Sequence, residues 1–247
     1  MTARTLLVRG MLVGVLSGIV AFVVARFLGE SPINSAIAFE ATHEAPGAGM
    51  PEIVSRTVQS TIGLATGITV IGAAVGGLFA LVYTVLQGRL GRLGARGTAG
   101  SIALTGFVVV YLIPTLKYPA NPPSIGSSET IGRRTALYFT AIAICLLTAI
   151  AAGLIGKHLA PKLGAWNAVT LVVAGALVVA TAALSFLPGV HETPAGFPAD
   201  VLWRFRLASV AIQATLWATV GLTFGALTDR SFRAMTPSGA LAPAPNA

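Results

Sequence analysis

The stretch Thr61–Leu86, TIGLATGITVIGAAVGGLFALVYTVL, runs for 26 residues without one charged side chain. About 20 apolar residues in a helix cross a hydrocarbon core roughly 30 Å thick, so this stretch predicts a transmembrane helix. Five further stretches of 18 to 23 residues have no charge in their middle: Leu6–Leu28, Ala99–Leu116, Thr135–Ile155, Ala165–Leu187 and Leu207–Thr228. With 55% hydrophobic and 10% charged residues, the chain is not a soluble domain. The sequence predicts an all-α, polytopic membrane protein with a bundle of six transmembrane helices.

The charges on the connecting segments predict the orientation of these helices. With the N-terminus inside, the inner segments hold nine basic residues and one acid, Asp229. The outer segments hold seven basic and seven acidic residues, so the inner face accounts for the whole net charge of +8. Excess lysine and arginine marks the cytoplasmic side, which predicts that both termini lie inside. Basic loops beside anionic lipid headgroups also explain the pI near 10.6, and no nucleic-acid partner is expected.

The domain organisation is predicted to be simple. Residues 1–230 form a single integral membrane domain, and residues 231–247 form a disordered cytoplasmic tail that is rich in proline and small residues. The one cysteine, Cys145, lies inside the fourth predicted span, where it has no partner for a disulfide.

The three predicted outer loops end on a shared pattern, an acid followed by an arginine four residues later. The pairs are Glu52–Arg56, Glu129–Arg133 and Asp200–Arg204, and Asp229–Arg233 repeats the spacing at the inner side. An acid in the first helical turn meets the positive end of the helix dipole, and an arginine one turn later can pair with it. One interpretation is therefore a device that starts each helix, and the other is a set of acids that meet in one vestibule.

The first and third outer loops also bring histidines next to carboxylates. Imidazole and carboxylate groups together suit Co²⁺, Ni²⁺, Mn²⁺ and Zn²⁺. The candidate metal ligands are His191, Glu192, Asp200, His43, Glu44 and Glu40. The alternative is that all of these are ordinary solvated loop residues.

A proline-rich stretch, Lys117–Gly126, follows the third span. Its prolines fix backbone angles and remove amide donors, which predicts a stiff and non-helical segment at the outer membrane boundary. Tyr118 and Asn121 would either line an ion entrance or belong to a rigid connector in which Tyr118 is an interfacial anchor.

Two stretches carry a family resemblance. Leu116–Gly126, LKYPANPPSIG, and His191–Arg206, HETPAGFPADVLWRFR, resemble the predicted cobalt transporter subunit family CbtA, with weaker support around Phe39-Glu40. The resemblance implies a multi-pass protein of the bacterial inner (cytoplasmic) membrane, associated with cobalt uptake for cobalamin synthesis. It also implies a small partner subunit with one span and a histidine-bearing segment. Co²⁺, or Ni²⁺, would be cargo, and no permanently bound cofactor is expected.

The function predicted from these observations is the membrane subunit of a divalent transition-metal importer, and not an enzyme. The sequence has no phosphate-binding loop ending in Gly-Lys-Ser/Thr and no carboxylate in the middle of a span. Two alternatives stay open. One is a membrane-embedded metalloenzyme, although no His-Glu-x-x-His motif is present. The other is a non-transporting scaffold that anchors the small partner.

The predicted topology is testable by cysteine labelling. In a Cys145→Ala background, a cysteine at Ser127 should react with an impermeant reagent from outside, and one at Ser238 only after permeabilisation. Equal accessibility of both positions would contradict the arrangement with both termini inside.

Overall fold

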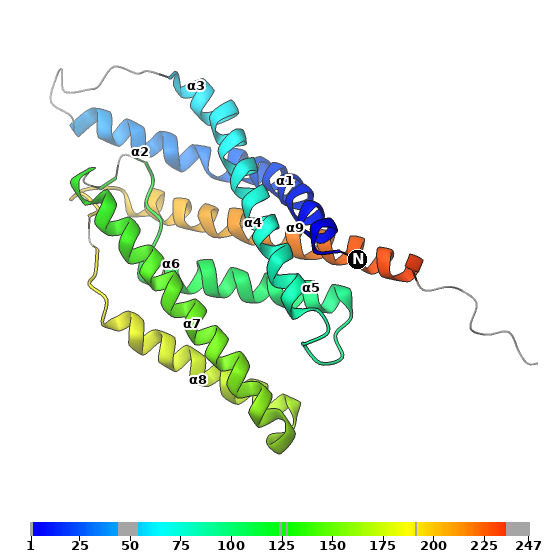
Figure 1. The fold of residues 1–247 in the computed structure, drawn as a ribbon. Coiled ribbons are helices and arrows are strands. Elements are labelled where there is room, and N and C mark those ends of the chain that lie inside the picture. Colours follow the sequence, from blue (N-terminus) through cyan, green and yellow to red (C-terminus); the bar gives the residue numbers. More distant parts are fainter. Residues whose placement is uncertain (1, 44–53, 124, 127, 191, 236–247) are drawn as a thin grey trace, which may run out of the picture. The chain divides into compact units, whose positions relative to one another are not determined.

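The computed structural model describes residues 2–43, 54–123, 125–126, 128–190 and 192–235 of the chain. Within these ranges all regular structure is helical (Figure 1). Six helical segments there are long and apolar enough to cross a membrane: Ala3–Leu28, Arg56–Leu86, Ala95–Lys117, Ile131–Leu163, Ala165–Ser185 and Ala199–Met235. Each overlaps one predicted span, so the all-α, six-helix prediction is confirmed. The orientation and the single membrane domain stay predictions, and residues 236–247 of the predicted tail lie outside the described residues.

Four of the six spans are single helices, and two are interrupted. The single helices are α1 (Ala3–Leu28), α7 (Ile131–Leu163), α8 (Ala165–Ser185) and α9 (Ala199–Met235). The second span joins α3 (Arg56–Val58), a π-helical turn (Gln59–Gly63) and α4 (Leu64–Leu86). The third joins α5 (Ala95–Gly106), a π-helical segment (Phe107–Leu112) and α6 (Ile113–Lys117).

The region between the first two spans differs from the simple loop that the sequence predicted. It contains a further helix, α2 (Glu30–His43). Glu30 lies in its first turn, where a carboxylate meets the positive end of the helix dipole. Pro32 is also in the first turn, where a missing amide hydrogen costs nothing, and no glycine or proline follows it up to His43.

The chain folds into two compact units that alternate along the sequence. Unit 1 comprises residues 1–22, 61–104 and 215–247, and unit 2 comprises residues 23–60 and 105–214. Because the boundaries fall inside helices, several helices contribute residues to both units.

In unit 1, α1 and α4 pack backbone against backbone through glycines. Gly10 faces Gly76, and Gly14 faces Gly72, so the two helices run antiparallel. A Cβ atom on Gly14 would collide with the carbonyl oxygen of Gly72. Such close approach strengthens the dispersion contacts between the two helices. These contacts matter in a bilayer because lipid removes the hydrophobic drive for helix association. Gly221 on α9 similarly lies against Ala103 on α5.

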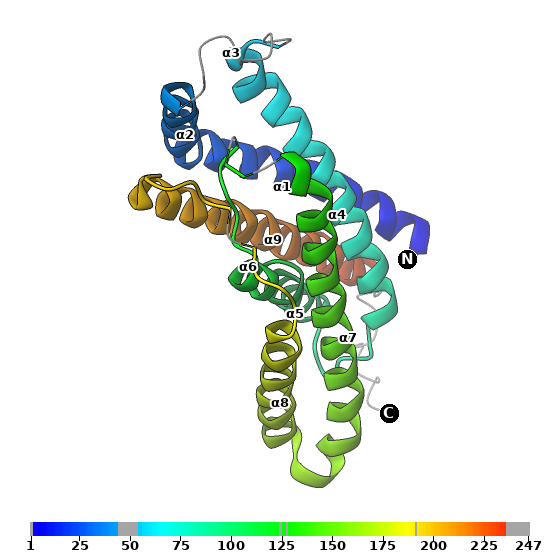
Figure 2. The ribbon, with the colours of Figure 1, turned by 90° about the vertical axis from the view of Figure 1, so that its left-hand side faces the viewer.

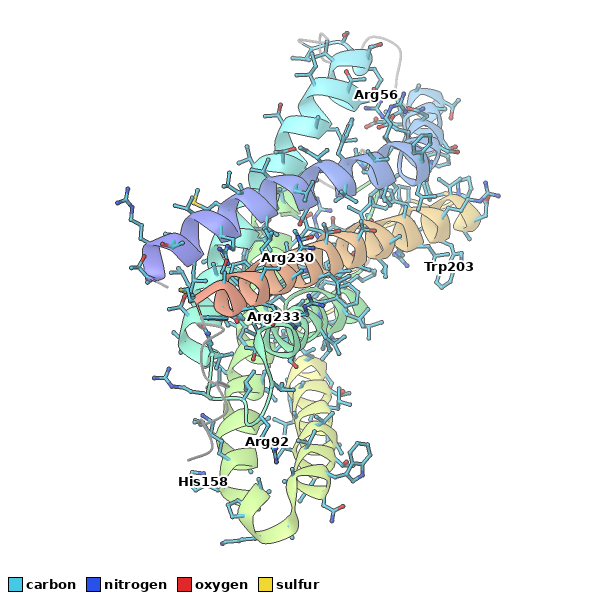
Figure 3. The ribbon with its side chains drawn as sticks, turned by 90° about the vertical axis from the view of Figure 1, so that its right-hand side faces the viewer. Arg56, Arg92, His158, Trp203, Arg230 and Arg233 are labelled. Atoms are coloured by element: carbon cyan, nitrogen blue, oxygen red, sulfur yellow. The ribbon has the colours of Figure 1, made fainter. Side chains whose placement is uncertain are left out.

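Unit 1 also has an aromatic core and a charged end. The Phe224 ring of α9 is fully buried, with its centroid 5.3 Å from that of Phe79 and 5.0 Å from that of Tyr83 on α4. Near the end of α9, Asp229 pairs with Arg96 of α5 at 2.9 Å and with Arg233 at 3.0 Å. Figure 3 shows Arg233 on this part of α9. The predicted Asp229–Arg233 pair is therefore confirmed.

In unit 2, α7 and α8 form a hairpin (Figures 1 and 2). Gly164 makes the turn between them with a φ of 77°, a left-handed conformation that favours glycine. His158 lies on α7 close to this turn (Figure 3). Cys145 is buried on α7 beside Ala141 and Leu184, which agrees with a packing role.

The π-helical segment before α6 has a local cause. Pro114 has no amide hydrogen, and its ring would clash with the carbonyl group four residues earlier in a regular α-helix. The backbone N–H of Ile113 instead donates to the carbonyl of Val108, five residues earlier. This wider turn lets the third span continue through the proline to Lys117.

The glycine contact in unit 1 predicts a position-dependent effect of one methyl group. Gly14→Ala should destabilise the protein by about 1–3 kcal/mol, because the new Cβ has no room beside the α4 backbone. Gly67→Ala on α4 is the matched control, since nothing lies within 4 Å of a Cβ built there. Equilibrium unfolding in mixed detergent micelles measures both variants. Equal stability of the two would show that α1 and α4 do not touch in this way.

Candidate functional site

Two segments of unit 2 meet at the predicted outer side. They are the proline loop (residues 118–127) and the histidine loop (residues 186–198). The Tyr118 hydroxyl donates a hydrogen bond to the Pro188 carbonyl, with 2.9 Å between the oxygens. Burial raises the pKa of Tyr118 above its ordinary value of 10.0, an effect that nearby Arg133 partly offsets. The hydroxyl therefore stays protonated and keeps this hydrogen bond at physiological pH.

Arg206 fixes the proline loop from the other side. Its Nε donates to the Ala120 carbonyl at 3.3 Å, and its Nη2 donates to Oδ1 of Asn121 at 3.2 Å. The neighbouring Pro122 is fully buried. A segment with few amide donors is thus held by a side chain from α9.

An apolar cluster connects both loops to α2. Ile125 of the proline loop, Phe197 of the histidine loop and Ala36 of α2 are buried together. Phe39 of α2 meets Phe197 edge to face, with ring centroids 5.1 Å apart. Segments that lie far apart in the sequence therefore share one small core.

An ion pair between Arg134 and Glu192 also holds the histidine loop. Arg134 Nε lies 3.2 Å from Glu192 Oε2, and the two side chains are 28% and 18% exposed. Gly126 packs against this pair with a φ of 116°. A Cβ atom there would lie 2.6 Å from Arg134 Nη1 and 2.9 Å from Glu192 Oε2, so another residue would shift the ends of these side chains as well as strain the backbone.

The structure describes only part of the predicted metal site. Glu192 is engaged with Arg134, and Asp200 is 66% exposed and lies 3.9 Å from Arg204. Glu40 is half-buried on α2. His191, Glu44 and the side chain of His43 lie outside the described residues. Among the residues that are described, no group of three or more histidine, cysteine and acidic side chains could hold a metal ion. The six-residue site stays a prediction.

The predicted acid–arginine pairs have mixed outcomes. The Asp200–Arg204 pair is present, although its two side chains are largely exposed and 3.9 Å apart. Arg56 donates to Glu30 Oε2 of α2 at 2.8 Å, and Figure 3 shows it pointing toward that helix. Its predicted partner Glu52 lies outside the described residues, and the Glu129–Arg133 pair stays a prediction.

A cavity of about 840 Å³ opens beside the two loops. Tyr118 and Asn121 both line it, and their role at an ion entrance stays a prediction. Its lining also includes three cationic side chains that the sequence analysis did not single out: Lys117, Arg134 and Arg206. In unit 1, a second cavity of about 390 Å³ has a mainly apolar lining and offers no comparable chemistry.

The comparisons with known proteins give a family. Residues 3–229 match the family model described as "Probable cobalt transporter subunit (CbtA)". This chain belongs to the CbtA family. No curated protein and no solved structure matches the chain. The match reaches into all six spans, so the resemblance predicted from the two loop stretches is confirmed over residues 3–229 of the CbtA chain.

The Arg134–Glu192 pair predicts how the histidine loop of this CbtA protein responds to loss of a charge. Glu192→Gln should raise amide hydrogen exchange in residues 186–198 by roughly fivefold or more, because the partly buried guanidinium loses its counter-charge at a net cost of about 1–3 kcal/mol. Asp200→Asn is the control, because that carboxylate is mostly exposed. Unchanged exchange in the Glu192 variant would mean that the pair does not hold the loop.

Proposed function

We propose that this chain is the integral membrane subunit of an importer for Co²⁺, or for the chemically similar Ni²⁺. The match of residues 3–229 to a probable cobalt transporter subunit is the observation that carries the proposal. The six membrane-competent helices support it, since a multi-pass protein can provide a path across the bilayer. The proposed location is the inner membrane of a bacterium, in support of cobalamin synthesis.

The proposed capture site consists of the histidine and carboxylate side chains of the predicted outer loops: His191, Glu192, Asp200, His43, Glu44 and Glu40. The contacts of Pro188 and Glu192 support this proposal, because they anchor the histidine loop on both sides of position 191. A ligand on an anchored loop loses less conformational entropy when it binds an ion. Glu192 would have to leave its ion pair with Arg134 before its carboxylate could bind the metal ion.

Tyr118 and Asn121 were predicted either to line an ion entrance or to belong to a rigid connector, and we propose the second role. The Asn121 carbonyl oxygen already accepts a hydrogen bond from Arg206, and the cavity beside it is lined by cations. A bare divalent cation would meet repulsion there. These two residues instead support the shape of the proline loop.

The term "subunit" in the family description supports a second component. We propose a small partner with one span and a histidine-bearing segment. It would hold the metal ion beside the outer loops before transfer, and the energy would come from the membrane potential, from an ion gradient or through the partner.

Uptake of radioactive Co²⁺ tests the proposal in cells that lack their own high-affinity cobalt transport. Cells that express the chain together with the partner should accumulate more Co²⁺ than cells that express the partner alone. Equal accumulation would contradict transport and leave the chain as a scaffold for its partner.

The proposed ligands predict a dependence on pH. Imidazole must be neutral to coordinate a metal, so binding of Co²⁺ to the purified protein should fall steeply between about pH 7 and pH 5.5, around the ordinary histidine pKa of about 6.5. Carboxylates alone would hold the ion to about pH 4. His191→Ala should weaken binding more than His43→Ala. A double histidine variant with unchanged affinity and pH profile would exclude both histidines as ligands.

A further inference from the structure

The cavity in unit 2 is lined by polar side chains that are not among the proposed metal ligands. Among the described residues that line it there are three cationic side chains and no carboxylate. Hydroxyl groups of tyrosine and threonine and the Asn121 amide supply the other polar atoms. Positive charges around one space attract an anion.

The three cations come from three different elements. Lys117 is at the end of α6, Arg134 is in the first turn of α7, and Arg206 is in the third turn of α9. Glu192 balances one of these charges through its ion pair with Arg134. Three positive charges and one negative charge leave the group of four at +2.

The arrangement of these side chains suits phosphate. The Arg206 guanidinium is fixed by the Ala120 carbonyl and by Asn121, and only two of its five N–H groups are used in these hydrogen bonds. A planar guanidinium that is already oriented matches the oxygen spacing of a phosphate group, and a lysine adds a compact point charge. Lys117 is half-buried, so less water screens its charge.

The same cavity continues into apolar surface. Leu116, Ile131 and Phe139 line it and are 77%, 54% and 64% exposed. Trp203 lies one helical turn before Arg206, is 62% exposed and projects away from α9 in Figure 3. Tryptophan is enriched at the level of lipid headgroups, which puts Arg206 near that level as well.

We propose that this cavity binds a phosphate group through Lys117, Arg134 and Arg206. The headgroup of an anionic lipid and free phosphate share this chemistry. The apolar lining favours the lipid, whose acyl chains would lie along Leu116 and Phe139 while its phosphate meets the cations. The site is separate from the proposed metal ligands, so its test requires no cobalt.

Native mass spectrometry of the delipidated full-length protein in detergent tests the site, with phosphatidylglycerol and phosphatidylcholine as probes. The wild type should bind phosphatidylglycerol more tightly than phosphatidylcholine. Lys117→Gln and Arg206→Gln should each weaken phosphatidylglycerol binding roughly fivefold, and the double variant roughly 25-fold. Arg204→Gln is the matched control, since this arginine lies on the same helix, is 70% exposed and does not line the cavity.

Two further arms complete the experiment. If millimolar inorganic phosphate displaces phosphatidylglycerol, the free anion also occupies the site; if the lipid stays bound, the site selects the headgroup. If Arg206→Gln fails to fold, Lys117→Gln alone tests the site. Lys117→Gln should fold, because no hydrogen bond or ion pair of the Lys117 side chain is found in the described part of the chain. Equal affinity of Lys117→Gln and wild type for phosphatidylglycerol would overturn the proposal, as would an equal loss in Arg204→Gln.

Discussion

Hydrocarbon cannot hydrate a charge, and this constraint decides where the polar chemistry of the protein lies. The six spans carry charged residues only toward their ends. The charges are therefore gathered into small groups, one around Asp229 in unit 1 and one around Arg134 in unit 2. Asp229 is shared by two arginines, whereas Glu192 is paired with Arg134.

The helices could be predicted from the sequence because a span is a local property. Long apolar stretches without internal charge are enough to identify all six, including the third span with Pro114. The helix α2 was missed because its residues have too little apolar character to predict a span. The correct signal was the acidic first turn at Glu30 followed by a stretch without helix breakers.

The partners of the charged side chains were predictable only within a helix. Asp229–Arg233 and Asp200–Arg204 follow from the four-residue spacing. Arg56 instead reaches Glu30, and Arg134 reaches Glu192, because the loops bring distant segments together. The place of Arg206 at the cavity was unpredictable for the same reason, because it depends on contacts with the distant residues Ala120 and Asn121. The candidate metal ligands come from the first and third outer loops, and their distances from one another depend on loop conformation, which no local pattern determines.

The interleaving of the two units has a consequence for biosynthesis. Unit 2 ends at residue 214, whereas unit 1 needs residues 215 onward, including Phe224 and Asp229. A ribosome that makes the chain from its N-terminus therefore completes every segment of unit 2 first. The glycine contact between α1 and α4 can form earlier than the rest of unit 1, because both helices precede α9 in the chain. The aromatic core and the ion pairs around Asp229, by contrast, can form only after the last helix has been made.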